Sequence, residues 1–214
     1  WTGTALIPEK DQKDVGLGLT LPLYVSGPHS VGYWGVFIMM LADLTAFASL
    51  VFGYFFFWTI HEDFPPPGAR GPGVLWPALG LAGVVGAWAL TVAARACNQR
   101  DKAFGYYVSL VVSWMLAAAG AAALIYGPVS TQLDPTAHCY QATVWMLVLW
   151  SVLHIGIGVI MQGYCFLRRL AGRMTSRYDI DIRNVTLYWH FTLLTVLLTV
   201  LVIAGFPLAS RGAG

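Results

Sequence analysis

Charged side chains are scarce in this chain of 214 residues, of which Asp, Glu, Lys and Arg make up only 10%. Soluble domains contain about 25% charged residues, whereas 57% of this chain is hydrophobic and its mean hydropathy is +0.66. This composition excludes a soluble globular domain and indicates a chain whose main solvent is lipid. The net charge of +2 comes from scattered groups and not from a basic stripe, which excludes a nucleic-acid partner.

Motifs for covalent catalysis are also missing. The sequence contains no G-x-S-x-G, no H-E-x-x-H and no glycine-rich phosphate loop, so it predicts no catalytic residue and no metal site. Its three cysteines are Cys97 and Cys165 near one predicted membrane face and Cys139 near the other. Because bonded Cα atoms lie within about 7 Å, no disulfide can join opposite faces. A bond between Cys97 and Cys165 would face a reducing compartment, so all three are interpreted as unpaired packing residues.

Five long apolar runs are present instead, and each is bounded by proline, glycine or charged residues. They exceed the length of about 9 to 11 residues that a barrel strand needs, and they suit helices that cross about 30 Å of hydrocarbon. The sequence therefore predicts an all-α bundle of transmembrane helices over 32–60, 74–94, 104–126, 140–167 and 184–206. Gly83 with Ala87, and Gly120 within 117–123, are small residues suited to close helix approach.

The ends of the chain differ from this bundle. Residues 1–31 are polar and then glycine-rich, with an apolar stretch too short to span, and we expect them to lie along the membrane surface or on a partner. Residues 207–214 are expected to form a short tail. Because the chain begins at Trp1 without a signal peptide, we expect a trimmed, processed or fused chain, or a cloning boundary.

The distribution of Lys and Arg predicts the orientation. Ten of the 12 lie before the first run or in the second and fourth loops, and only Arg70 and Arg211 lie on the other side. By the positive-inside rule the amino terminus is cytoplasmic and the carboxyl terminus is outside. The aromatic run 54–58 then falls at the outer end of the first helix, where Trp and Tyr are typical of headgroup anchoring.

Three ionisable residues lie inside the predicted spans, where such residues are costly and commonly functional: Asp43, His154 and His190. At 1.5 Å rise per residue they lie roughly 16, 20 and 9 Å from the cytoplasmic ends of their helices. The mismatch of about 10 Å argues against a haem or metal held by both histidines. Two interpretations stay open. Asp43 either relays protons with Thr45, Ser49 and Gln162, or it bonds to His154 or a hydroxyl and holds the bundle together.

These polar sites lie in three strings that resemble subunit III of the haem-copper oxidases. Residues 33–43, Tyr-Trp-Gly-Val-Phe-Ile-Met-Met-Leu-Ala-Asp, resemble the family's W-G-x-x-x-F-I-x-S-E helix. Residues 153–158 resemble its L-H-V-x-x-G helix, and Tyr188, Trp189, His190 and Phe191 resemble the Y-W-H-F that opens its last helix. The sequence departs from the family pattern at Asp43, where Glu is usual, and at Thr192, where a carboxylate is frequent. It also has five helices instead of seven, as do quinol oxidase relatives and chains fused behind subunit I.

The resemblance implies a multi-pass protein of the bacterial cytoplasmic (inner) membrane and a non-catalytic subunit of a proton-pumping oxidase that reduces oxygen to water. It would hold phospholipid but no redox cofactor; haem and copper would belong to subunit I, and further copper to subunit II in a cytochrome c oxidase. It would pack against subunit I, with which it could be fused, and beside subunit II. Asp43 would face subunit I or a lipid cleft, with His154 and His190 as its partners within the bundle.

Four arginines are candidates for lipid phosphates or are plain positive-inside anchors: Arg95, Arg168, Arg169 and Arg177. The alternative function is a small-solute or proton transporter that uses Asp43, which predicts inverted repeats with broken helices.

Overall fold

Five long helices make up most of the part of the chain that the computed structural model describes, residues 13–14, 16–18, 20–21, 30–176 and 179–211. The five are α1 Val31–Ile60, α2 Leu75–Gln99, α3 Ala103–Ser130, α4 Cys139–Leu170 and α5 Ile180–Val200. Each of α1 to α4, and the continuous segment Ile180–Leu208, is long and apolar enough to cross a membrane. The predicted all-α transmembrane bundle is therefore confirmed for the described residues.

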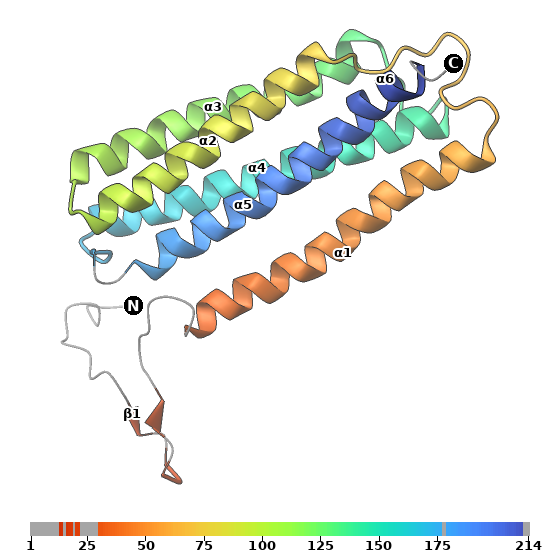
Figure 1. The fold of residues 1–214 in the computed structure, drawn as a ribbon. Coiled ribbons are helices and arrows are strands. Elements are labelled where there is room, and N and C mark those ends of the chain that lie inside the picture. The colour runs from red at the N-terminus through yellow and green to blue at the C-terminus, as the bar shows by residue number, and fades with distance from the viewer. Residues whose placement is uncertain (1–12, 15, 19, 22–29, 177–178, 212–214) are drawn as a thin grey trace.

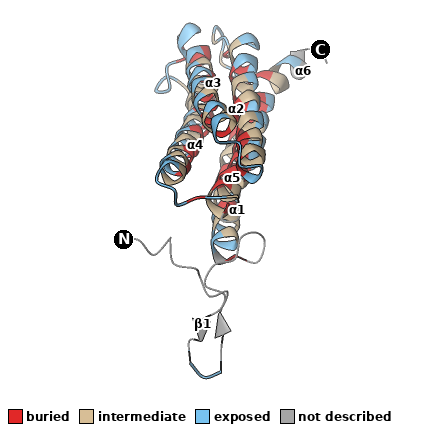
Figure 2. Ribbon diagram, turned by 90° about the vertical axis from the view of Figure 1, so that its left-hand side faces the viewer, coloured by how far each residue is buried: buried red, intermediate tan, exposed pale blue. Residues whose placement is uncertain are grey.

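The helices pack as two pairs and a single helix (Figure 1). Helices α2 and α3 run side by side, α4 and α5 lie against them, and α1 lies along α4 and α5 at the edge of the bundle. Buried residues follow the lines along which the helices meet, and exposed residues face outward (Figure 2). The outer faces are rich in large apolar side chains, as lipid or another membrane protein requires.

Glycines set the close contact between α2 and α3. A Cβ atom added to Gly83 would lie 2.8 Å from the Cα of Gly120, and one added to Gly120 would lie 2.9 Å from the carbonyl oxygen of Gly80. These distances are below ordinary van der Waals contact, so only glycine allows the two backbones to approach this far. The predicted role of Gly83 and Gly120 is confirmed.

Several helices are longer than predicted. Helix α3 runs through Pro128 to Ser130 instead of ending at 126, and α4 ends at Leu170 instead of 167. Helix α2 continues past 94 to Gln99, because Asn98 is buried and its Nδ2 donates to the Thr175 carbonyl at 3.1 Å. Helix α5 begins at Ile180 instead of 184. Asn98 therefore makes a tertiary contact within the helix instead of marking the end of the span.

The end of the fifth span is irregular. A π-helical turn, Leu201–Gly205, separates α5 from a short helix α6, Phe206–Arg211. Pro207 has no backbone N–H, and in a regular α-helix its ring would collide with the carbonyl of Ile203, which the wider turn avoids. The predicted tail 207–214 is therefore helical as far as Arg211, and 212–214 lie outside the described residues.

Most of the predicted surface segment 1–31 also lies outside the described residues. Within its described part, strands β1 Lys13–Asp14 and β2 Thr20–Leu21 pair antiparallel. The hydropathy pattern did not predict this pairing.

Candidate functional site

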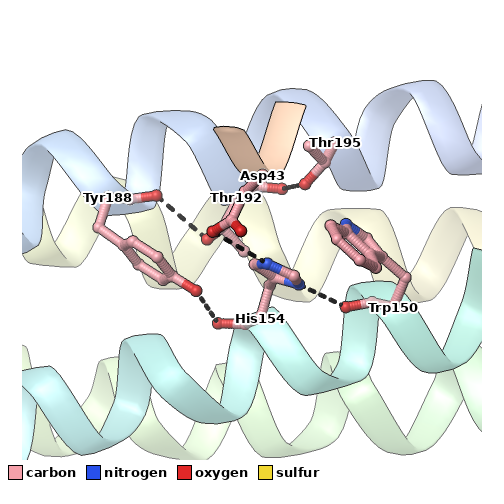
Figure 3. A network of polar contacts seen from close by, with 6 residues as sticks. All are labelled: Asp43, Trp150, His154, Tyr188, Thr192 and Thr195. Atoms are coloured by element: carbon pink, nitrogen blue, oxygen red, sulfur yellow. Dashed lines mark hydrogen bonds and ion pairs between the residues drawn. The ribbon is translucent and has the colours of Figure 1, made fainter. Parts of the chain in front are cut away.

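Asp43 of α1 faces His154 of α4 within the bundle (Figure 3). Its Oδ2 lies 3.7 Å from His154 Nε2. The His154 side chain is 4% exposed, whereas that of Asp43 is 35% exposed. The structure thus brings together two of the three predicted ionisable residues, and the carboxylate touches a buried imidazole on one side while its other side is open.

The hydrogen bonds of His154 fix where its protons lie. Nδ1 is 2.8 Å from the carbonyl oxygen of Trp150, one turn earlier on α4. Since a carbonyl only accepts, Nδ1 carries the hydrogen. In a neutral ring Nε2 is then a bare acceptor that faces another acceptor, the carboxylate of Asp43. The two groups attract only if one further proton is held by the pair, on the carboxyl or on the ring.

Hydroxyls of α5 lie around this pair but do not extend it into a proton path (Figure 3). The Tyr188 hydroxyl donates to the His154 carbonyl at 3.4 Å. Thr192 and Thr195 donate at 3.1 Å to carbonyls of their own helix. A hydroxyl that donates to a carbonyl holds two helices or two turns together, and the carbonyl has no proton to pass on.

The residues proposed for a relay with Asp43 make their hydrogen bonds to other groups. Thr45 donates to the Leu41 carbonyl and Ser49 to the Thr45 carbonyl, both at 3.0 Å on α1 itself. Gln162 lies in a different cluster, on the side of α4 that meets α2 and α3. Within the described residues the geometry favours the packing interpretation of Asp43.

Trp189 and His190 point in different directions from α5. Trp189 is fully buried, and a Cβ added to Gly158 would come within 3.1 Å of its indole, so the glycine of the 153–158 string makes room for this ring. His190 is exposed; its Nδ1 lies 2.6 Å from the Thr186 carbonyl, and its ring packs edge-on against Trp88 of α2. His190 does not join Asp43 and His154.

No family model and no curated protein matches this chain. Its function is therefore inferred from the polar groups described here and from the three strings around Asp43, His154 and His190. Those strings lie on α1, α4 and α5, the helices that meet around the Asp43–His154 pair.

A second polar cluster joins three helices and was not predicted. Gln162 Nε2 of α4 donates to Thr91 Oγ1 at 2.6 Å and to Ser113 Oγ at 2.9 Å. Thr91 and Ser113 in turn donate to the Ala87 carbonyl of α2. All four residues are fully buried. Such a network stabilises and orients the bundle. The sequence feature that could have predicted this cluster is the presence of two small polar residues, Thr91 and Ser113, in otherwise apolar helices.

Two of the predicted lipid-binding arginines have carboxylate partners within the chain. Arg95 Nε lies 3.9 Å from Asp179 Oδ2, and Arg168 Nε lies 3.3 Å from Asp181 Oδ2. These contacts occur where α2 and α4 end and α5 begins, which we call the Arg-rich end. The sequence pattern did not predict these two pairs, because they form only where the ends of α2 and α4 meet the start of α5.

The other two arginines differ from this pattern. The Arg169 guanidinium lies over the Tyr106 ring of α3, 4.8 Å from its centroid, a cation–π contact that also fixes α4 to α3. Arg177 lies outside the described residues.

The opposite end of the bundle, where α1 ends and α4 begins, is rich in aromatic side chains. We call it the His61 end, after the residue that follows α1. Tyr54 is 1% exposed and packs against Phe64, Tyr140 and Phe206. Interfacial anchoring was therefore the wrong interpretation for Tyr54, because it lies on the same side of α1 as Phe47 and faces inward. Phe56 and Trp58 of the same run are exposed and remain suited to that role.

A hollow of about 560 Å³ opens at this end beside Tyr54, Tyr140 and Phe206. The nearby loop between α3 and α4 is held by Asp134, whose Oδ1 accepts from the Thr136 hydroxyl and backbone N–H at 2.7 and 2.8 Å. These hydrogen bonds, the side-chain one first, hold the pKa of the Asp134 carboxyl below its ordinary value. The loop therefore keeps this negative charge to a lower pH than an aspartate without these hydrogen bonds would.

Proposed function

We propose that this chain is a non-catalytic accessory subunit of a haem-copper oxidase, similar to subunit III, and that it packs against subunit I along α1. The observation that carries the proposal is the half-open position of Asp43. Its carboxylate contacts His154 inside the bundle. The Asp43 side chain is nevertheless 35% exposed, although it lies within a helix that is long and apolar enough to cross a membrane.

An acidic group open to hydrocarbon is costly, and such groups face a protein interior or a water-filled space. On α1 the residues beside the open side of Asp43 are Met39, Ala42 and Ala46, all exposed. The two alanines, Ala42 and Ala46, are small residues four positions apart, a pattern that suits the close approach of a helix from another subunit. A polar group of that subunit would then complete the surroundings of Asp43.

The proposal assigns the chemistry to other subunits. Haem and copper would be held by subunit I, further copper by subunit II where cytochrome c is the donor, and this chain would support subunit I in the bacterial inner membrane. Phospholipid would bind beside Arg169 more readily than beside Arg95 and Arg168, because the latter two are each already close to a carboxylate.

A transporter based on Asp43 receives less support. The hydroxyls near Asp43 donate to carbonyls of α1 and α5, and the hollow at the His61 end is not lined by Asp43. Helices α1 to α4 run unbroken over 25 to 32 residues, and the π turn follows α5 near the end of its span. Broken helices at mid-membrane are what transporter sites of the inverted-repeat type use.

Photo-crosslinking in native membranes tests the proposed interface. A photoreactive amino acid at Met39, which is 45% exposed, should capture the haem-bearing subunit, identified by mass spectrometry of the cross-linked peptides. At about 100° per residue, Met39 lies on the open side of Asp43.

The matched control is the same amino acid at Phe52, which is 69% exposed on the opposite side of α1. The photoreactive amino acid at Phe52 should give lipid adducts and little cross-linked haem-bearing subunit. Equal capture from both positions, or none from Met39, would contradict the proposed interface.

A further inference from the structure

Two histidines and a cysteine from distant parts of the sequence meet at the His61 end. His61 directly follows α1, His138 precedes α4, and Cys139 is the first residue of α4. One potential ligand atom from each of the three lies within 4.8 Å of the others. His61 is exposed and the other two are half-buried, so a small ion can reach the cluster from the aqueous side.

The side chains around the cluster restrict its rings. The His61 ring stacks on Phe57 and lies edge-on to His138, with ring centroids 5.9 and 5.7 Å apart. The Phe64 ring lies 6.5 Å from that of His138. Ligands held in this way lose less conformational freedom when they bind an ion.

Imidazole nitrogen and thiolate sulfur are the ligand set of zinc. Zn–N bonds are about 2.0–2.1 Å and Zn–S bonds about 2.3 Å, so tetrahedral ligand atoms lie roughly 3.3–3.7 Å apart. No pair of ligand atoms therefore has to close by more than about 1.5 Å, which small side-chain rotations can supply because His61 is exposed. Cys139 lies at the first turn of α4, where the helix dipole favours the negative charge of a metal-bound thiolate.

Binding competes with a helix cap. His138 Nδ1 accepts a hydrogen bond from the Tyr140 backbone N–H at 3.1 Å. A neutral imidazole has one acceptor nitrogen, so His138 cannot cap α4 and ligate an ion at the same time. Ion binding would thus exchange this cap for a metal bond.

We propose that His61, His138 and Cys139 bind one zinc-like divalent cation, with water in the fourth position, and that the ion fastens the end of α1 to the start of α4. A bound ion would add a link where α1 has few others. Among the described helices α1 lies at the edge of the bundle and has extensive contacts only with α4 and α5. The loop that follows His61 carries Glu62 and Asp63, whose charges attract cations to this end.

The test uses the full chain, reduced, freed of metal with a chelator and reconstituted in lipid nanodiscs. Titration with Zn²⁺ against a chromophoric zinc indicator should give one bound ion per chain. Zinc X-ray absorption should show two nitrogen ligands and one sulfur ligand. Cys139→Ser and His61→Ala should each weaken binding by about tenfold or more.

Cys97→Ser is the matched control, because Cys97 is a half-buried free thiol at the Arg-rich end, and it should bind Zn²⁺ like the unmodified chain. Within the unmodified chain, Zn²⁺ should slow maleimide labelling of Cys139 but not of Cys97, a result that does not depend on how well a variant folds. The proposal is overturned if no ion binds, if the bound ion has no sulfur ligand, or if Cys139→Ser binds as tightly as the unmodified chain.

Discussion

Gly83→Ala is expected to lower the free energy of unfolding by about 1–3 kcal/mol, the usual cost of overpacking a close contact. The added methyl group would lie 2.8 Å from both the Gly120 Cα and the Leu116 carbonyl oxygen of α3. Both are backbone atoms, so no side-chain rotation relieves the contact and the two helices must separate. Separation would also disturb the cluster in which Thr91 and Ser113 bond to Ala87.

Gly156→Ala provides the matched control for this prediction. Gly156 also lies within a helix, but a Cβ there meets nothing within 4 Å. Because alanine favours helix more than glycine does, this variant should be as stable as the unmodified chain or slightly more stable. Both variants can be unfolded with SDS in mixed micelles and followed by circular dichroism. If Gly83→Ala matched Gly156→Ala, the close packing of α2 on α3 would be disproved.

Asp43→Leu is expected to reduce the amount of this chain that assembles with its proposed partner. The substitution leaves His154 Nε2 without the group that faces it at 3.7 Å. Lost polar contacts between membrane helices cost about 0.6–1.7 kcal/mol, and the proposed interface would lose its central polar group as well. A loss of 1–2 kcal/mol corresponds to roughly 5- to 30-fold in an equilibrium. Quantitative immunoblotting of the purified complex measures the change.

Asp43→Asn separates packing from proton transfer. The amide keeps the shape of the carboxyl group and can donate to His154 Nε2, but it cannot release a proton. We expect normal assembly and normal oxygen consumption per assembled complex. Normal assembly with turnover abolished would instead establish Asp43 as a proton carrier and would refute its interpretation as a packing residue.

The features that the sequence predicted well are local. The spans follow from runs of apolar residues, and the contact at Gly83 follows from small residues at helical spacing, since each pattern lies within one helix. Helix rise also predicted that Asp43 and His154 share a level near the middle of their spans, but their contact is shown only by the structure.

The features that it did not predict depend on which helix faces meet. Gln162 could reach Asp43 or the α2–α3 pair, and only the packing shows that it bonds Thr91 and Ser113. The pairing of Arg95 with Asp179 joins the last turns of α2 to the residue before α5, which are far apart in the sequence. The sequence predicts Cys139 only as a packing residue, since His61 is distant in sequence and comes close to it only through the contact between α1 and α4.

Purification of this chain from its native membranes in mild detergent, with haem and copper quantified against it, tests the central claim most directly. The proposed function predicts that the chain elutes in a complex with a fixed ratio of haem and copper to chain. It also predicts that the chain carries neither haem nor redox-active copper once stronger detergent separates it from its partners. A chain that elutes intact without any haem-bearing partner, or that retains stoichiometric haem when isolated, would contradict the account.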